Sequence, residues 1–258
     1  MGTVSKALSL LTYFSRSRSL IGLSELSRLS GLNKATVHRL MNELQDGGFV
    51  EQAGTGREYR LGVAFLRYAA LREAAVPMRE VTLDVLTELA EATGETAHVS
   101  LLQGQTLSTL AYVYSHQHGT RVTMEDAEIL PLHATSSGLA VLGFSDADFV
   151  DEALSAKLTA LTANTETNPT KLRKTLAQVR ADCMAESVGN FEDDVHTHAM
   201  PLFDARQTCI GALAVAAPVS RMDEALRTAI RANLRQAAPR LTRAMGGFLP
   251  QSFNEAAA

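Results

Sequence analysis

A short run of polar and cationic residues between positions 33 and 42 carries the chemistry needed to recognise a nucleic acid. Apolar residues recur there at helical spacing, at Val37, Leu40, Met41 and Leu44, which predicts a helix that buries this side. No acidic residue lies within residues 33–42, so nothing on the first turns of this helix would repel a phosphate backbone. In the major groove of DNA an Arg side chain can pair with guanine and an Asn side chain with adenine. The candidate DNA-contacting residues of this helix are Asn33, Lys34, Thr36, His38, Arg39 and Asn42.

The residues before this helix predict another short helix and a tight turn. Leu26 and Leu29 fit the buried side of a helix, and Gly31 suits the left-handed residue that ends it. Asn33 is a good N-cap for the helix that follows. Two short helices joined in this way form a helix-turn-helix.

Two short strands then predict a wing. Residues 49–52 and 57–61 have strand character, and the Gly-rich residues 53–56 between them predict a turn. Arg57 and Arg60 could contact phosphates, which would fix the register on DNA without reading its sequence. Because helix-turn-helix geometry also occurs in proteins that never bind DNA, a small helical bundle with a hairpin is the alternative.

Charge is distributed unevenly along the 258 residues. Residues 1–68 contain nine Lys or Arg and five acidic residues, a net charge of +4, which leaves −8 for the rest of a chain whose total is −4. Such an imbalance is expected where a module that binds a polyanion is joined to a body that does not. A chain of this length is expected to form about two domains.

Composition excludes several protein classes. No apolar run approaches the ~18 residues needed to span a bilayer. The first residues lack the pattern of a secretory signal. Cys183 and Cys209 are the two cysteines, too few for a disulfide framework. We therefore expect a cytoplasmic protein without membrane association.

The rest of the chain has the pattern of an α+β domain. Strand pairs interrupted and flanked by helices favour an antiparallel sheet with helices packed on it. The expected strands are residues 96–102, 107–114, 196–203 and 209–217, and the expected helices are residues 81–89, 136–144, 146–154, 170–184 and 225–245. The expected boundaries are a winged helix-turn-helix domain at 1–62, a linker helix at 63–76, a sheet domain at 77–249 and a frayed tail at 250–258.

The sequence Ala134-Thr135-Ser136-Ser137-Gly138 predicts an anion-binding site. Small residues before a helix leave backbone N–H groups accessible at its positive end, and the two serines add hydroxyl donors. The alternative is that this run only caps a helix.

Three blocks of the sequence, in order, resemble the IclR family of bacterial transcription regulators. The first lies within residues 23–62 and includes the segment from Ser30 to Leu40. The second is Leu130-Pro-Leu-His-Ala-Thr-Ser-Ser-Gly-Leu-Ala-Val-Leu142. The third is Ala199-Met-Pro-Leu-Phe-Asp204, followed by Gly211-Ala-Leu-Ala-Val-Ala-Ala-Pro218.

The resemblance implies a winged-helix DNA-binding domain, a linker helix and a GAF-like effector-binding domain, assembled as a homodimer or homotetramer that represses or activates transcription. It also implies that the second block, and the loop and strand around the third, line an effector pocket. The sequence departs from the family pattern at Leu139 and at residues 194–198, which bears on the identity of the effector. The candidate effector-binding residues are Ser136, Ser137, Gly138, Asp194, Thr197, Ala214 and Ala216.

Two of these candidates suggest the character of the effector. Ala214 and Ala216 are two apart, so they face the same side of a strand. Alanine makes a pocket less polar, which favours an organic acid with an aromatic or otherwise partly apolar body. The alternative is that both alanines belong to a tightly packed core.

Other constellations fall short of a catalytic or metal site. The sequence has no P-loop, no G-x-G-x-x-G after a strand and no G-x-S-x-G elbow, so we expect neither catalysis nor a cofactor. His116/His118 and His196/His198 could each supply half of a metal site, with carboxylates at 192–194. No dense Cys/His cluster completes either pair, so no metal is predicted. The rival function is a small-molecule-binding or metabolic protein whose N-terminal helices serve oligomerisation.

Overall fold

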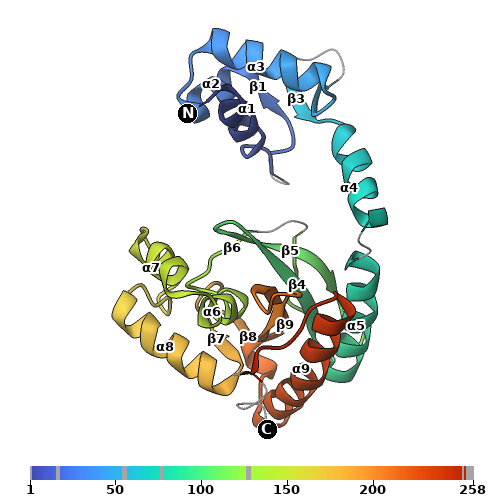
Figure 1. The fold of residues 1–258 in the computed structure, drawn as a ribbon, viewed down its shortest axis with the longest axis vertical. Coiled ribbons are helices and arrows are strands. Elements are labelled where there is room, and N and C mark those ends of the chain that lie inside the picture. Colours follow the sequence, from blue (N-terminus) through green and yellow to red (C-terminus); the bar gives the residue numbers. More distant parts are fainter. Residues whose placement is uncertain are drawn as a thin grey trace. The chain divides into compact units, whose positions relative to one another are not determined.

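The computed structural model describes residues 2–15, 18–53, 57–75, 78–125, 129–251 and 253. The chain divides into two units, residues 1–77 and 78–258, and each is described by itself (Figure 1). The predicted turn of the wing at 53–56 lies mostly outside the described residues, which stop at Ala53 and resume at Arg57. No helix in the described ranges is both long and apolar enough to cross a membrane.

The N-terminal unit packs short helices on a small antiparallel sheet. Its strands run in the order β1-β3-β2. Gly31 has the left-handed backbone (φ 68°) expected where the first helix of the helix-turn-helix ends. The elements are α1 (Thr3–Leu11), β1 (Ile21–Gly22), α2 (Leu23–Ser30), α3 (Lys34–Asp46), β2 (Val50–Gln52), β3 (Glu58–Leu61) and α4 (Ala64–Ala75).

The core of this unit is where the helical spacing predicted it. Val37, Leu40 and Met41 of α3 are buried together with Leu10 and Leu26. Burial of one apolar stripe holds α3 against α1 and α2, which turns its polar side outward.

Helix α4 is anchored to the residues that begin the wing. The Ala64 amide donates to the carbonyl of Gly48 at 3.0 Å. The Phe49 ring lies 5.6 Å from the Phe65 ring and 5.8 Å from the Tyr68 ring, centre to centre. The start of the predicted linker helix is therefore fixed to the helix-turn-helix by aromatic packing.

The C-terminal unit is built on one antiparallel sheet, in the order β6-β5-β4-β9-β8-β7 (Figure 1). Helices α6 and α8 lie on one face, and α5 and α9 lie on the other. The elements are α5 (Met78–Thr93), β4 (Thr96–Gln103), β5 (Thr106–Val113), β6 (Ile129–Leu130), α6 (Ser136–Gly143), α7 (Ala147–Ser155), α8 (Pro169–Asp182), β7 (Ala185–Val188), β8 (Val195–Phe203), β9 (Cys209–Pro218), η1 (Val219–Arg221) and α9 (Glu224–Ala244).

The sheet has a strand that the sequence analysis missed. We expected a helix over 170–184, but α8 ends at Asp182 and Cys183 adopts a left-handed backbone with φ 53°. This reversal lets residues 185–188 return as β7, which pairs with β8.

The frayed tail predicted at 250–258 is wrong at Phe253. This side chain is 1% exposed and packs 5.8 Å from the Phe144 ring and 5.6 Å from the Phe203 ring. Burial of a large aromatic surface outweighs the polar character of its neighbours. Ser252 and residues 254–258 lie outside the described part of the chain.

Candidate functional site

The polar side of α3 is exposed, as the helical spacing predicted. Lys34, His38, Arg39 and Asn42 are exposed, and Thr36 is half-buried. Within the described residues, no hydrogen bond or ion pair engages the side chains of the four exposed residues. These donors are therefore available to an external partner.

Asn33 has a structural task at the start of this helix. Its Oδ1 accepts a hydrogen bond from the Thr36 amide at 2.8 Å, which caps α3. The cap fixes the direction in which the first turn projects. The first turn contains no acidic residue, so the positive end of the helix is not neutralised.

The two arginines of the wing differ in their surroundings. Arg57 and Arg60 are both exposed, but the Nε of Arg60 lies 2.6 Å from Oε1 of Glu51 on the neighbouring strand. A phosphate contact by Arg60 would therefore have to use its remaining N–H groups, whereas no described carboxylate lies within ion-pair distance of Arg57.

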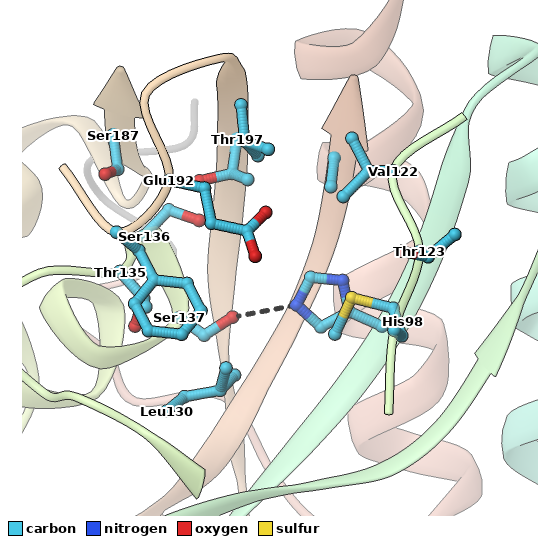
Figure 2. Close-up of a pocket in the computed structure, with 14 residues that line it drawn as sticks. His98, Val122, Thr123, Leu130, Thr135, Ser136, Ser137, Ser187, Glu192 and Thr197 are labelled. Atoms are coloured by element: carbon cyan, nitrogen blue, oxygen red, sulfur yellow. Dashed lines mark hydrogen bonds between the residues drawn. The ribbon is translucent and has the colours of Figure 1, made fainter. Parts of the chain in front are cut away.

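A pocket lies in the C-terminal unit, between the start of α6 and the sheet (Figure 2). Its volume is about 50 Å³, which is room for a few water molecules. Four of the predicted effector-binding residues line it: Ser136, Ser137, Thr197 and Ala216. The other lining residues are His98, Val122, Thr123, Met124, Leu130, Thr135, Ser187, Phe191, Glu192 and Val195.

Three predicted residues lie outside the lining for identifiable reasons. Gly138 packs so closely on the backbone of Leu132 that a Cβ atom would clash there. Asp194 is exposed, and its carbonyl accepts from the Val219 amide at 2.8 Å. Ala214 is fully buried within the sheet.

The start of α6 supplies the pocket's donors. Thr135 caps the helix, because its Oγ1 accepts from the Gly138 amide at 3.0 Å. The amides of Ser136 and Ser137 then lie at the positive end of the helix, beside their own hydroxyls. This arrangement suits one small anionic or hydrogen-bond-accepting group.

His98 forms the opposite wall of the pocket. It was not among the predicted effector-binding residues. Its Nε2 lies 3.3 Å from Oγ of Ser137 (Figure 2), and its Nδ1 has no partner among the described residues. Burial lowers the pKa of His98 to about 4, so this imidazole is neutral at pH 7. The alternation of Thr96, His98 and Ser100 with apolar residues along β4 was the signal that could have identified it.

The pocket carries little permanent positive charge. No Lys or Arg occurs among its described lining residues. Burial, followed by the charge of Asp194, raises the pKa of Glu192. The pocket therefore offers a bound group the dipole of α6 and hydroxyl donors, with no cationic side chain among its described lining residues.

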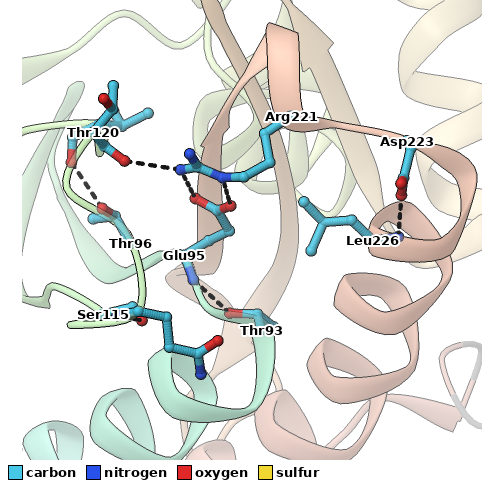
Figure 3. Close-up of polar contacts among 10 residues, drawn as sticks. Thr93, Glu95, Thr96, Ser115, Thr120, Arg221, Asp223 and Leu226 are labelled. Carbon is cyan, nitrogen blue, oxygen red and sulfur yellow. Dashed lines mark hydrogen bonds and ion pairs between the residues drawn. The ribbon is translucent and has the colours of Figure 1, made fainter.

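A buried ion pair holds one wall of the pocket in place (Figure 3). The Arg221 guanidinium donates to both carboxylate oxygens of Glu95, and its Nη2 also donates to the Thr120 carbonyl at 3.0 Å. Thr96 Oγ1 donates to the Val122 carbonyl at 2.7 Å. These bonds hold the loop that follows β5, which brings residues 122–124 to the pocket.

The chain matches two family profiles that together span most of its length. Residues 3–54 match the IclR helix-turn-helix domain, and residues 72–243 match the bacterial transcriptional regulator IclR C-terminal domain.

Known proteins resemble the chain along nearly all of it. The HTH-type transcriptional regulator XynR of Escherichia coli is 29% identical, over 95% of this chain and 97% of that protein. A solved structure of an IclR-type transcriptional regulator from Silicibacter sp. TM1040 is 54% identical, with a TM-score of 0.94, over 98% of this chain and 99% of that chain. An IclR homolog from Microbacterium hydrocarbonoxydans, solved in complex with 4-hydroxybenzoate, is 24% identical, with a TM-score of 0.77, over 94% of this chain and all of that chain.

Proposed function

Because the chain belongs to the IclR family of bacterial transcriptional regulators, we propose that it reads a pseudo-palindromic operator and is switched by a small organic acid. Members of this family bind DNA through the helix-turn-helix and are regulators, not enzymes. The observation that carries the proposal is the exposed polar side of α3 opposite its buried stripe, whose first turn has no acidic residue. Asn33, Lys34, Thr36, His38, Arg39 and Asn42 present this face to the major groove, with Arg57 and Arg60 of the wing on phosphates.

A homodimer would supply the two reading heads. The N-terminal unit exposes apolar side chains that a second copy could cover, among them Val4 and Leu8 on α1 and Leu66 and Leu71 on α4. Exposed apolar surface of this kind favours association. A two-fold dimer would read two half-sites in inverted orientation.

The test of DNA binding is selection from a pool of random duplexes, followed by affinity measurements at rising salt. We expect an enriched inverted repeat. Affinity for it should fall by roughly 10³- to 10⁵-fold between 50 and 200 mM salt if the assembled protein contacts about 6–10 phosphates. No enriched sequence, or an affinity that salt leaves unchanged, would favour the rival in which these helices serve only assembly.

The effector is proposed to bind in the pocket at the start of α6. A carboxylate would accept hydrogen bonds from the amides and hydroxyls of Ser136 and Ser137, while Ala216 and Val122 would contact an aromatic or partly apolar body. The 4-hydroxybenzoate bound by the Microbacterium hydrocarbonoxydans homolog is an acid of this class. Since the volume is about 50 Å³, the ligand must be small or the walls must open around it.

We expect 4-hydroxybenzoate or a related acid to raise the melting temperature of the full chain. At 100 times its Kd, a ligand adds about 2.7 kcal/mol, which is roughly 5–10 °C for a unit of this size. Ser137→Ala removes one donor and should weaken binding by about tenfold, since a hydrogen bond to a charged group contributes about 1.5 kcal/mol. The amide analogue 4-hydroxybenzamide tests the carboxylate.

Ser155→Ala is the matched control, because Ser155 is exposed at the end of α7 and its hydroxyl bonds only to the Glu152 carbonyl among described residues. Equal shifts with the amide and the acid, or equal losses in both serine variants, would overturn the assignment of the carboxylate to α6. The ligand can switch DNA binding only by binding one arrangement of the protein better than another.

A further inference from the structure

A second polar cluster lies on the opposite face of the sheet from the pocket. His196 and His198 alternate with Thr197 along β8, so Thr197 faces the pocket and both imidazoles face α9. β7 pairs with β8 so that Glu186 lies directly opposite His198. The sheet register therefore brings a carboxylate to a pair of histidines.

The three side chains converge on a single point. Nε2 of His196 lies 2.7 Å from Oε1 of Glu186, and Nε2 of His198 lies 3.4 Å from the same oxygen. The imidazole rings are stacked, with centres 5.0 Å apart and planes inclined by 18°. One ligand atom from each of the three residues lies within 4.8 Å of the others.

The two ring nitrogens of His198 lack hydrogen-bond partners in the described part of the chain. Yet this side chain is fully buried. A buried polar group without a partner is unfavourable, and a neutral imidazole with a free lone pair is the form that binds a metal ion.

We propose that Glu186, His196 and His198 form a binding site for a divalent transition metal ion, with zinc as the ion of best fit. Two imidazole nitrogens and one carboxylate oxygen are a donor set that zinc accepts, with a water molecule in the fourth position. Ligand bonds of about 2.0–2.2 Å require donor atoms roughly 3.0–3.5 Å apart. The 3.4 Å between His198 and Glu186 lies in this range, and the 2.7 Å between His196 and Glu186 would have to widen slightly around an ion. The Glu186 side chain is partly exposed, which gives the ion a route of entry.

The arginines of α9 set the affinity of this site. Nη2 of Arg227 lies 3.4 Å from Oε1 of Glu186, so the guanidinium competes with a metal ion for this carboxylate. Arg227 also lies 3.6 Å from exposed Glu224, which can hold it when the metal takes Glu186. The nearby charge of Arg231 disfavours a cation as well.

The carboxylate is not one that the sequence analysis considered. The carboxylates expected beside these histidines were those at 192–194, but Glu192 lines the pocket on the other face and Asp194 is exposed. Glu186 lies on β7, which was not predicted as a strand.

The test is zinc binding by the full-length protein after chelator treatment and dialysis, measured by competition with a chromophoric chelator. We expect one equivalent per chain and a rise in melting temperature on adding zinc. Glu186→Gln and His196→Gln should each weaken binding by at least about 100-fold, since even indirect support of a metal ligand contributes 10- to 100-fold. Arg227→Gln should instead tighten it, because a competing cation is removed.

The control is the double variant His116→Gln/His118→Gln, which removes the other, exposed histidine pair and should leave zinc binding unchanged. Melting curves in metal-free buffer establish that each variant is folded. No stoichiometric zinc binding by the unaltered chain, loss of binding in the control, or unchanged binding in Glu186→Gln and His196→Gln would overturn the proposal. Weaker binding in Arg227→Gln would also contradict it.

Discussion

We expect Arg39→Ala to weaken operator binding by roughly 1–3 kcal/mol, about 5- to 150-fold, and to relax specificity at one base position in each half-site. Arg39 is exposed on α3, one residue before buried Leu40, and no described acid holds its guanidinium. A free Arg on a recognition helix can bind guanine through two hydrogen bonds. The measurement is a gel-shift titration with the selected duplex and with single-base variants of it.

Lys34→Ala distinguishes base reading from phosphate binding on the same helix. Lys34 begins α3 at its positive end, so we expect a phosphate contact whose loss weakens binding to all sequences alike and lowers the salt slope by about 1. Arg206→Ala and Lys157→Ala are matched controls on exposed positions of the C-terminal unit. Unchanged operator affinity in both Arg39→Ala and Lys34→Ala would show that α3 is not the reading helix.

Arg221→Met should destabilise the C-terminal unit by about 3–5 kcal/mol, the usual effect of leaving one charge of a buried pair without its partner. The Glu95 side chain is 1% exposed, and Arg221 is its bidentate partner (Figure 3). For a unit of this size the loss corresponds to a fall in melting temperature of roughly 6–20 °C. Differential scanning calorimetry of the full chain measures it.

Two variants test whether the loss of stability comes from the buried charge that Arg221→Met leaves without a partner. Arg240→Met breaks an ion pair with Glu88 in which both side chains are about half exposed or more, so we expect a loss below about 1 kcal/mol. Glu95→Gln/Arg221→Met removes the orphaned charge and should recover part of the stability lost in Arg221→Met. Equal losses in Arg221→Met and Arg240→Met would contradict a special role for the buried pair.

The helix-turn-helix was predictable because its signals are local. Gly31 ends one helix, Asn33 caps the next, and the apolar stripe of α3 has the helical period. The same reasoning found β4, β5, β8 and β9, whose apolar residues alternate or run together. Each of these signals lies in residues close together in the chain, so it can be recognised from a single sequence.

The features that were missed depend on contacts distant in sequence. β7 follows Cys183, which ends α8 with a left-handed backbone. Glycine or asparagine usually occupies such a position, so a cysteine there gives no sequence signal for the end of the helix. Glu186 could not be matched to His198 without the register of β7 on β8. Phe253 packs against Phe203 from the end of the chain.

Only part of the candidate effector-binding set lies around one cavity, for a similar reason. Ser136, Ser137, Thr197 and Ala216 were found through the resemblance and the small-residue run, and they line one cavity. Gly138 follows a lining residue but packs on the backbone of Leu132, and Ala214 faces the same side of β9 as Ala216 but is fully buried. His98 reaches the pocket from a strand 39 residues upstream of Ser137.

Strand β8 is a two-sided element, and this has a thermodynamic consequence. Thr197 contributes to the cavity on one side, and its immediate neighbours His196 and His198 form the proposed metal site on the reverse. An occupant that displaced this backbone from one side would also move the side chains on the other, because adjacent residues share a peptide plane. By linkage, whatever factor a bound ion applies to the Kd of the effector, the effector must apply to the Kd of the ion.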